Sequence, residues 1–185
     1  MQAFTEARTD RSADEFWLVE HPPVYTMGLK GRDRRYEPIH GIPVIQTDRG
    51  GDLTYHGPGQ LVLYPLLDLR RLNLGPRALV QRIEGSVIDL LQGYGITGTT
   101  REGAPGVYVA DSKIASLGLR IRNHASYHGL ALNVDLDVTP FTWIDPCGYR
   151  GLEVTRLADL GVADDVEAAG TALLDRLLRK LGYTA

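Results

Sequence analysis

A glycine-rich stretch carries most of the side chains that could hold a ligand. Residues 49–60 read RGGDLTYHGPGQ, with four glycines in twelve positions. Because glycine has no Cβ, such a backbone can approach a ligand closely and expose its N–H groups. Two tight turns would also explain the glycines, but polar side chains lie among them, namely Arg49, Thr54, His56 and Gln60. The stretch therefore predicts a substrate site.

Nucleotide and metal motifs are missing from the sequence. No Gly-Lys-Ser/Thr follows the glycines of residues 49–60, and the third glycine of a dinucleotide fingerprint is absent. His124 and His128 are four residues apart, but they lie across an expected turn and strand rather than on a helix. We therefore expect no metal and no cofactor, and His56 is the one histidine within a dense motif.

The single cysteine, Cys147, stands between Pro146 and Gly148, a pair that predicts a sharp turn. A lone cysteine is most often a small buried hydrophobe. A glycine after a nucleophile can, however, leave its backbone N–H facing an oxyanion. Lys113 begins an alternating stretch and would be an ordinary exposed lysine unless a nucleophile lies nearby. Spacing alone decides neither residue's role.

The elements that must position these residues are mostly strands. Alternating apolar positions between prolines, glycines and polar turns predict strands at 15–20, 43–47, 53–56, 60–68, 106–109, 113–122 and 126–134. Asn123-His124 supplies a hairpin turn between the last two. A loop over 140–151 then contains Cys147.

Two helices complete the pattern. One begins at Pro76 and ends at Gly93–Gly95, with apolar residues at helical spacing. The other begins near Asp164, where Glu167 completes a capping-box pattern, and ends at Gly182. Because strands outnumber helices and hairpins are frequent, we expect an α/β domain of the α+β type. Its sheet should be mixed, largely antiparallel and flanked by helices.

Composition narrows the class of protein. A chain of 185 residues is long enough for a single domain over residues 1–185. The net charge is −3 and no basic stripe occurs, so no nucleic-acid partner is expected. The most apolar run, 61–69, is too short for a membrane span. The polar first ten residues predict no secretory signal, and one cysteine excludes an internal disulfide, so we expect the cytoplasm.

Five segments together resemble the lipoyl(octanoyl) transferase family. Residues 49–60 resemble its R-G-G-x-x-T-x-H-G-P-G-Q motif, and residues 113–118 (KIASLG) resemble its lysine motif. Residues 126–134 (SYHGLALNV) match the segment that follows. Residues 146–148 (PCG) match its cysteine motif, and residues 20–26 (EHPPVYT) its opening strand and loop. The segments occur in family order over nearly the whole chain, which makes the resemblance specific.

This resemblance implies the fold of the catalytic domains of lipoate and biotin protein ligases. It also implies transfer of an octanoyl group from octanoyl-acyl carrier protein to a lysine of lipoyl domains, in 2-oxoacid dehydrogenases and the glycine cleavage H protein. By matching position, Cys147 is the nucleophile and Lys113 lowers its pKa. The substrate-binding residues implied are Arg49, Gly50, Gly51, Asp52, Leu53, Thr54, Tyr55, His56, Ser116, Leu117, Gly118, Gly129, Leu130 and Ala131. Family members usually carry a strand and half helix before the position of Met1, so this chain is expected to begin inside that helix.

The implied chemistry needs a thiolate and a base. A free thiol has a pKa of about 8.5, so only a small fraction is ionised at neutral pH. An ammonium at about 4 Å contributes about 1 kcal/mol in water and about 4 kcal/mol at an effective dielectric near 20, against about 1.4 kcal/mol per pKa unit. Lys113 could therefore lower the thiol pKa by about two units in a partly desolvated cleft. Lys113, His56 or His128 could then accept the proton of the attacking amine, and no ATP is required.

Three other functions remain open from the residues. An ATP-dependent lipoate or biotin protein ligase of the same fold would need no nucleophilic cysteine. A Cys-His hydrolase would pair Cys147 with His56 and use water as the acceptor. A non-catalytic acyl-protein-binding module would form no thioester.

Overall fold

A six-stranded antiparallel sheet forms the centre of the molecule. The computed structural model describes residues 1–31, 37–144 and 152–183. Within them the sheet has the strand order β1-β5-β9-β8-β7-β6. Its strands are β1 (Glu15–Val19), β5 (Gln60–Leu66), β6 (Gly98–Thr99), β7 (Gly106–Val109), β8 (Ser112–Arg122) and β9 (Ala125–Asn133). Every residue of β9 is buried, so this strand is covered on both faces.

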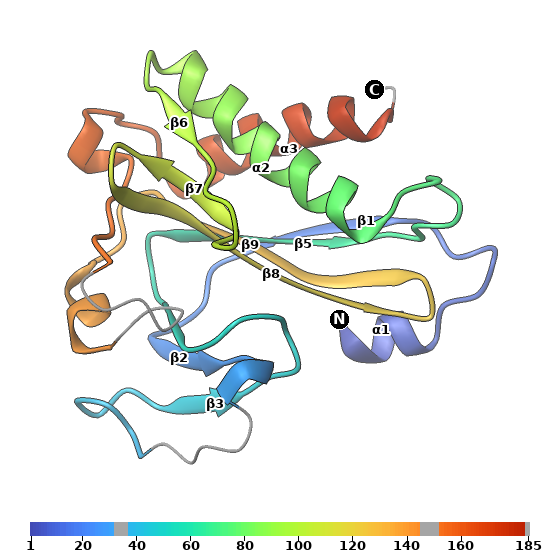
Figure 1. Cartoon of the computed structure of the whole chain (residues 1–185), viewed down its shortest axis with the longest axis horizontal. Helices are drawn as coiled ribbons and strands as arrows, with labels where there is room; N and C mark the ends of the chain where they lie inside the picture. Colours follow the sequence, from blue (N-terminus) through green and yellow to red (C-terminus); the bar gives the residue numbers. More distant parts are fainter. Residues whose placement is uncertain (32–36, 145–151, 184–185) are drawn as a thin grey trace.

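A second, smaller sheet has the order β3-β2-β4. Its strands are β2 (Val24–Met27), β3 (Val44–Gln46) and β4 (Thr54–His56). β2 pairs in parallel with β3 and antiparallel with β4. Figure 1 shows β2 and β3 on the side of the large sheet opposite to the two long helices. The expectation of mixed, largely antiparallel strands flanked by helices is confirmed.

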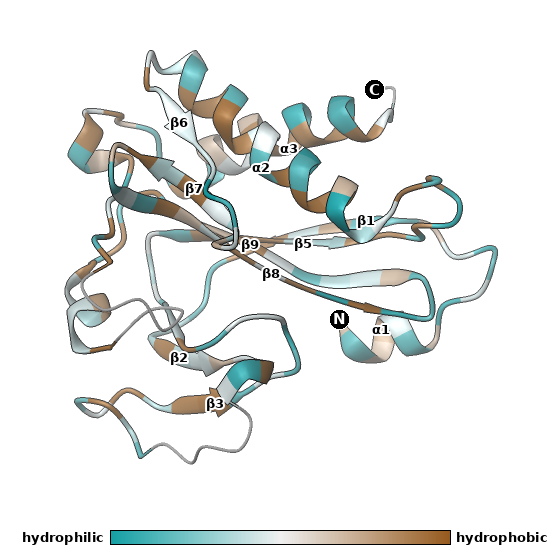
Figure 2. Cartoon of the chain, in the orientation of Figure 1, coloured by the Kyte–Doolittle hydropathy of each residue, from teal (hydrophilic) through white to brown (hydrophobic). Residues whose placement is uncertain are grey.

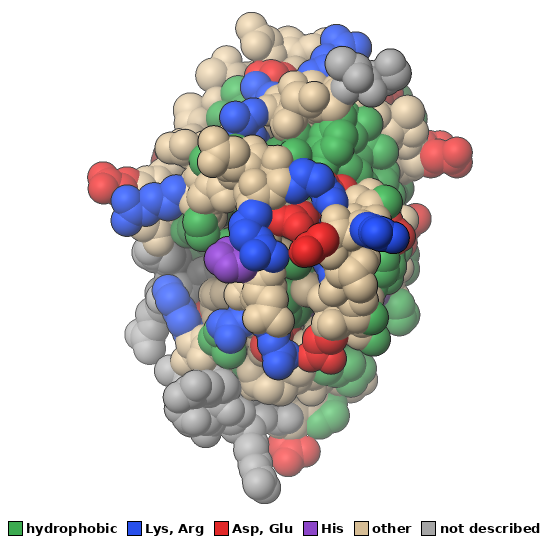
Figure 3. Space-filling view, turned by 90° about the vertical axis from the view of Figure 1, so that its right-hand side faces the viewer, with side chains coloured by type: hydrophobic (Ala, Val, Ile, Leu, Met, Phe, Trp, Pro, Cys, Tyr) green, Lys and Arg blue, Asp and Glu red, His purple; other side chains and the backbone are tan. Residues whose placement is uncertain are grey.

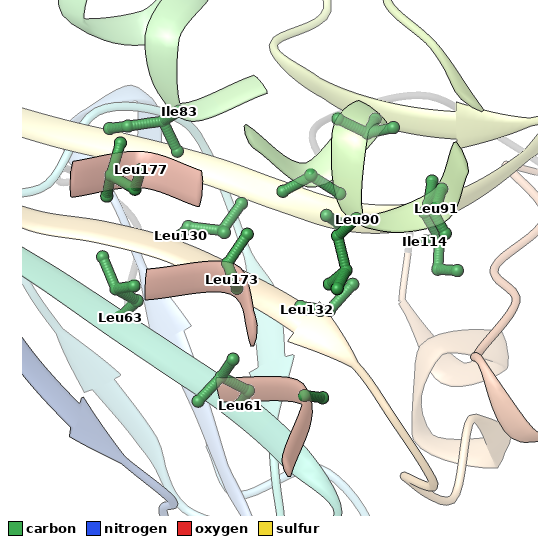
Figure 4. Close-up of a cluster of buried hydrophobic side chains, with 14 of the residues drawn as sticks. Leu61, Leu63, Ile83, Leu90, Leu91, Ile114, Leu130, Leu132, Leu173 and Leu177 are labelled. Atoms are coloured by element: carbon green, nitrogen blue, oxygen red, sulfur yellow. The ribbon is translucent and has the colours of Figure 1, made fainter. Parts of the chain in front are cut away.

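The two long helices, α2 (Pro76–Gly93) and α3 (Val166–Leu181), pack side by side on one face of the large sheet (Figure 1). Both alternate between hydrophilic and hydrophobic residues in Figure 2, as expected for helices with one buried face. Leucine and isoleucine side chains from these helices and from β5, β8 and β9 meet in the core shown in Figure 4. The core includes Leu63, Ile83, Leu130 and Leu173, each at most 1% exposed.

The helix ends follow local chemistry. Pro76 is the first residue of α2, as predicted. The N-cap of α3 is Asp165, whose carboxylate accepts a hydrogen bond from Ala168 N–H at 2.8 Å. The sequence pattern had favoured Asp164, but that carboxylate accepts a hydrogen bond from the Tyr94 hydroxyl instead. Gly182 ends the helix with a φ of 84°.

Ion pairs attach the N-terminal segment to the large sheet. The short helix α1 (Gln2–Glu6) contributes Glu6, which pairs with Arg122 at 2.7 Å. Arg8 and Asp14, which pair with each other at 2.6 Å, are both buried. They bond in turn to the end of β5 and the residues after it, since Arg8 donates to the Leu66 carbonyl and Asp14 accepts from the Asp68 N–H. In Figure 3, basic and acidic side chains are interspersed across the face that it shows. Short 3₁₀ helices lie at η1 (Leu29–Gly31), η2 (Thr139–Trp143) and η4 (Ala158–Leu160).

The predicted hairpin turn is confirmed. Asn123 and His124 have φ values of 50° and 64°, the left-handed pair that a tight two-residue turn requires. Two short strands, β2 and β6, were not among the predicted ones. β2 follows two prolines and β6 has two residues, so neither shows a period long enough to detect.

Candidate active site

A cavity of about 230 Å³ lies between the small sheet and the large sheet. Its wall is largely apolar, with valine, leucine and alanine side chains from both sheets. The lining residues from the strands are Val24, Thr26, Ile45, Thr54, His56, Val62, Tyr64, Ser116, Leu117, Gly118, His128, Gly129, Leu130 and Ala131. Such a cavity fits a narrow aliphatic group better than a polar one.

Most of the residues implied in substrate binding line this cavity. They are Arg49, Gly51, Thr54, His56, Ser116, Leu117, Gly118, Gly129, Leu130 and Ala131. His128, considered for proton transfer, lines it as well. Three segments far apart in the sequence, 49–56, 116–118 and 128–131, therefore meet at one site.

Four of the implied residues do not line this cavity. Leu53 and Tyr55 are buried in a separate cluster with Tyr25 and Phe141. The Asp52 carboxylate accepts a hydrogen bond from the Leu53 N–H at 2.9 Å. Gly50 lines a second cavity. These residues shape the strand and turn that carry Thr54 and His56.

Arg49 holds the glycine-rich turn to β2. Its guanidinium donates to the Thr26 hydroxyl at 3.1 Å, to the Asp52 carbonyl at 2.7 Å and to its neighbour Gly50's carbonyl at 2.9 Å. The turn also binds β8, since Gly50 N–H donates to the Leu119 carbonyl at 3.0 Å. The Arg49 side chain and the backbone of Gly50 thus together join the small sheet to the large one at the cavity.

Glycine on β9 lets the strands approach closely beside the cavity. A Cβ at Gly129 would lie 2.0 Å from the carbonyl oxygen of Leu63 on β5, far inside van der Waals contact. The preceding residue, His128, has a φ of 58°, an unusual value for a residue with a side chain. This local distortion turns the His128 side chain to the cavity wall.

His128 is paired with a carboxylate that the sequence pattern did not single out. Its Nε2 lies 2.7 Å from Asp48 Oδ1, and Gln2 and Tyr127 also donate to Asp48. Burial opposes ionisation of Asp48, but these hydrogen bonds outweigh it and lower its pKa to about 2. Burial lowers the pKa of His128, against the opposing effect of Asp48. At neutral pH the pair is therefore a carboxylate beside a neutral imidazole.

This pairing fixes the tautomer of His128. An ionised carboxylate only accepts hydrogen bonds, so Nε2 of His128 must carry the proton and Nδ1 the lone pair. His128 is thus a neutral base held by Asp48, the arrangement in which histidine can accept a proton.

His56 lies in a different network. Its Nδ1 is 2.7 Å from Gln60 Oε1, and its Nε2 is 3.1 Å from the Thr26 hydroxyl. Gln60 in turn donates to Asn133 at 2.9 Å, which assigns its oxygen to His56. Burial lowers the pKa of His56 to about 4. Both ring nitrogens are therefore used in positioning neighbours, and the ring is neutral.

Lys113 is 3% exposed and lines the second cavity, of about 420 Å³. Its Nζ donates to the Pro105 carbonyl at 3.2 Å and lies 5.2 Å from the centre of the Tyr108 ring. The two cavities share Gly51, Leu117 and Gly118 as walls. The lysine therefore lies beside the apolar cavity, across a thin partition of small residues and one leucine.

Cys147 lies outside the described residues. The chain that follows it returns to Lys113, because Lys113 N–H donates to the Glu153 carbonyl at 2.8 Å and Thr155 N–H donates to the Lys113 carbonyl at 3.0 Å. Among the described residues, no group of three or more His, Cys, Asp or Glu is placed to hold a metal ion. The described helices include none that is long and apolar enough to cross a membrane.

Solved structures share this fold at low sequence identity. A bipartite lipoate protein ligase from Thermoplasma acidophilum matches with a TM-score of 0.75, at 15% identity, over 99% of this chain and 77% of that one. Biotin protein ligase from Aquifex aeolicus, in complex with biotin and ATP, matches with a TM-score of 0.59, at 18% identity, over 84% of this chain and 67% of that one. The fold expected from the resemblance is confirmed.

Several curated proteins are far more similar to this chain in sequence than these solved structures are. An octanoyltransferase from Azoarcus sp. (strain BH72) is 58% identical over 98% of this chain and 80% of its own length. One from Laribacter hongkongensis is 57% identical over 98% of this chain and 87% of its own length. The model of the lipoyl protein ligase A/B catalytic domain matches residues 1–178. The chain therefore belongs to the lipoyl protein ligase A/B catalytic domain family, and its high-identity relatives within it are octanoyltransferases.

Proposed function

We propose that this protein transfers an octanoyl group from octanoyl-acyl carrier protein to a lysine of lipoyl domains, through a thioester on Cys147. The observation that carries this proposal is the 57–58% identity to octanoyltransferases over nearly the whole chain. The protein is thus an acyltransferase of lipoate biosynthesis. Its acceptors are the lipoyl domains of 2-oxoacid dehydrogenases and the glycine cleavage H protein.

The apolar cavity supports binding of the acyl chain. Val24, Val62 and Leu130 from three strands face a space closed by Gly129 and Ala131. Moving a methylene group from water to such a wall contributes about 0.8 kcal/mol, so six methylenes of an octanoyl chain contribute about 5 kcal/mol. This hydrophobic contribution favours binding of the acyl chain and requires no charged group.

The reaction proceeds by two acyl transfers. The Cys147 thiolate attacks the carbonyl carbon of the donor thioester, and the carrier's thiolate leaves and takes up a proton. The amine of the acceptor lysine then attacks the Cys147 thioester. An amide forms, the Cys147 thiolate leaves, and a base removes the proton of the amine.

Lys113 is assigned to the activation of Cys147. The buried ammonium lies next to the acyl cavity, and the backbone of 153–155 bonds to the backbone of Lys113. Cys147 is six residues before Glu153 in the sequence. A buried cation stabilises a nearby thiolate far more than an exposed one does.

His128 is assigned as the acceptor of the amine proton. It lines the acyl cavity, it is neutral, and Asp48 orients it. His56 also lines the cavity and is neutral, but the Thr26 hydroxyl already occupies its Nε2. Since the free thiol of Cys147 requires a reducing compartment, we place the reaction in the cytoplasm.

Intact-mass measurement tests the proposal. The protein is mixed with octanoyl-acyl carrier protein, after apyrase has removed nucleotide, and its mass is recorded with and without an acceptor lipoyl domain. We expect one octanoyl adduct that disappears when the acceptor is added and is absent from Cys147→Ala. An adduct that persists in Cys147→Ala, or transfer that requires ATP and magnesium, would overturn the thioester mechanism.

A further inference from the structure

A buried carboxylate, Glu84, stands on the apolar face of α2. Glu84 is 8% exposed. Its neighbours on the buried side of α2, Ile83 and Val87, are fully buried. A carboxylate in such surroundings is costly unless a hydrogen bond or a cation compensates for lost water. Glu84 Oε1 accepts a hydrogen bond from the Gly106 N–H at 2.8 Å.

The same peptide unit also binds Lys113. The carbonyl of Pro105 accepts the hydrogen bond from Lys113 Nζ at 3.2 Å, and the N–H of that peptide belongs to Gly106. The Pro105–Gly106 peptide therefore connects the carboxylate at one end to the ammonium at the other. Because the dipole of a peptide is rigid, an anion at its N–H strengthens its carbonyl as an acceptor.

Gly106 is the residue that makes this bridge compact. Its φ is 133°, and a Cβ there would lie 2.4 Å from the Ala115 carbonyl oxygen and 3.4 Å from Lys113 Nζ. The backbone of β7 thus runs directly against the lysine side chain. The orientation of this one peptide decides where the ammonium is held.

Among the described residues, Glu84 is an anion whose charge interacts with that of Lys113. Lys30, on η1, lines the same cavity and carries the same charge as Lys113. Tyr108, on β7, presents its ring, and the Glu153 carboxylate binds the Ser112 hydroxyl at 3.1 Å. Burial raises the pKa of Glu84, while the Gly106 hydrogen bond and the charge of Lys113 act in the opposite direction.

We propose that Glu84 is a positioning residue for Lys113, which it holds in place through the Pro105–Gly106 peptide. The proposal rests on the proposed function for its catalytic meaning, since Lys113 would activate Cys147. The claim that Glu84 holds Lys113 in place does not depend on that function. Loss of the negative charge at position 84 should displace the Lys113 ammonium and slow the acylation of Cys147.

The small number of lysines permits a direct test. The chain has three, Lys30, Lys113 and Lys180, so a protein labelled with [¹³Cε]lysine gives three NMR signals to follow against pH. Lys113→Arg identifies the Lys113 signal by its disappearance. Glu84→Gln keeps the size of the side chain and an oxygen that can accept the Gly106 hydrogen bond, but removes the charge. We expect the Lys113 signal to change its chemical shift in this variant relative to the parent at the same pH, because the peptide that accepts its hydrogen bond is no longer held by an anion.

A matched control lies on the same helix. Asp89 pairs with Lys180 at 2.7 Å, so Asp89→Asn removes one negative charge from α2 without touching the peptide that binds Lys113. In this control the Lys180 signal should move and the Lys113 signal should not. Circular dichroism checks that both variants fold. An unchanged Lys113 signal in Glu84→Gln would overturn the inference.

Acylation kinetics complete the test. In single turnover with octanoyl-acyl carrier protein, Glu84→Gln should acylate about tenfold more slowly than the parent, with a donor KM within about twofold. Glu84→Asp, which retains the charge, should recover part of the rate. If the Lys113 signal shifts but the parent forms no octanoyl adduct, the proposed function is wrong and the Glu84 inference stands. If the parent acylates and Glu84→Gln acylates at the same rate, Glu84 has no positioning role in the reaction.

Discussion

His128 Nε2 and Asp48 Oδ1 lie 2.7 Å apart although 80 residues separate them in the chain. The contact joins β9 to the residue just before the glycine-rich turn, at the wall of the acyl cavity. It fixes the tautomer of a histidine in a strained backbone conformation, while burial lowers the pKa of the ring and keeps it neutral.

Asp48→Asn should slow the second acyl transfer. The imidazole of His128 would lose the anion that orients it and stabilises its protonated form. We expect transfer from pre-acylated enzyme to a lipoyl domain to fall about tenfold, with thioester formation within about twofold of the parent. Rapid quench and mass measurement separate the two steps. Asp111→Asn removes an exposed carboxylate paired with Arg101 and serves as the control. Equal transfer rates in both variants would contradict a role for the pair.

Asp48 should also contribute to stability in a pH-dependent manner. Its pKa of about 2 in the folded protein lies below the ordinary value of 3.8. A lowered carboxyl pKa stabilises the fold above about pH 4, and this contribution disappears as the pH falls toward 2. Urea unfolding of the parent and Asp48→Asn should show a larger difference at pH 6 than at pH 3. A difference that grows on acidification would show the opposite linkage.

His56→Ala should impair transfer more than His124→Ala. The His56 ring binds Gln60 and Thr26 in the cavity wall, whereas His124 occupies the turn between β8 and β9. We expect kcat/KM to fall at least about tenfold for His56→Ala and to stay within about twofold for His124→Ala. Steady-state transfer to a lipoyl domain measures both. Equal values would show that the histidine of the glycine-rich motif has no special role.

Lys113→Met should raise the pKa of the Cys147 thiol by about one unit or more, because it removes a buried cation and keeps much of the side-chain stem. The rate of iodoacetamide alkylation against pH measures the thiolate directly, since the chain has one cysteine. Lys113→Arg keeps a charge and should preserve part of the effect, while transfer stays slow. Overlapping curves for the parent and Lys113→Met would reject Lys113 as the activator, and His56 or His128 would become the leading candidate.

Gly129→Ala should destabilise the fold by at least about 2 kcal/mol, because the new Cβ would lie 2.0 Å from the Leu63 carbonyl oxygen. Gly85→Ala, inside α2, meets only the flexible end of Lys180. It should be neutral or stabilising by up to about 1 kcal/mol, since alanine is favoured over glycine within helices. Urea denaturation compares the two, and equal stabilities would show that β5 and β9 can separate at little cost.

Local chemistry in the sequence predicted the elements well where a short-range signal was strong. Pro76 marked the start of α2, and Asn123-His124 marked the β8–β9 turn. The capping-box pattern with Glu167 favours a helix start near Asp164, whereas the N-cap is its neighbour Asp165. A distant hydroxyl, on Tyr94, distinguishes them in space.

The family resemblance of the motifs at 49–60, 113–118 and 126–134 predicts that they share one site, and Cys147 remains a prediction from its motif. Their roles within the site depend on contacts that no spacing encodes. Leu53 and Tyr55 belong to the motif but turn into the core, since alternate residues of a strand face opposite sides.

Glu84 shows most directly what could not be predicted from the sequence alone. A charged residue among the apolar positions of α2 was a visible signal that something must compensate for it. Its partner is a backbone N–H, 22 residues away, and every non-proline residue has one. Sequence alone therefore determined which residue types the site contains. Only the packing of α2 against β7 decided that the carboxylate and Lys113 share a single peptide, because that contact depends on the tertiary path of the chain.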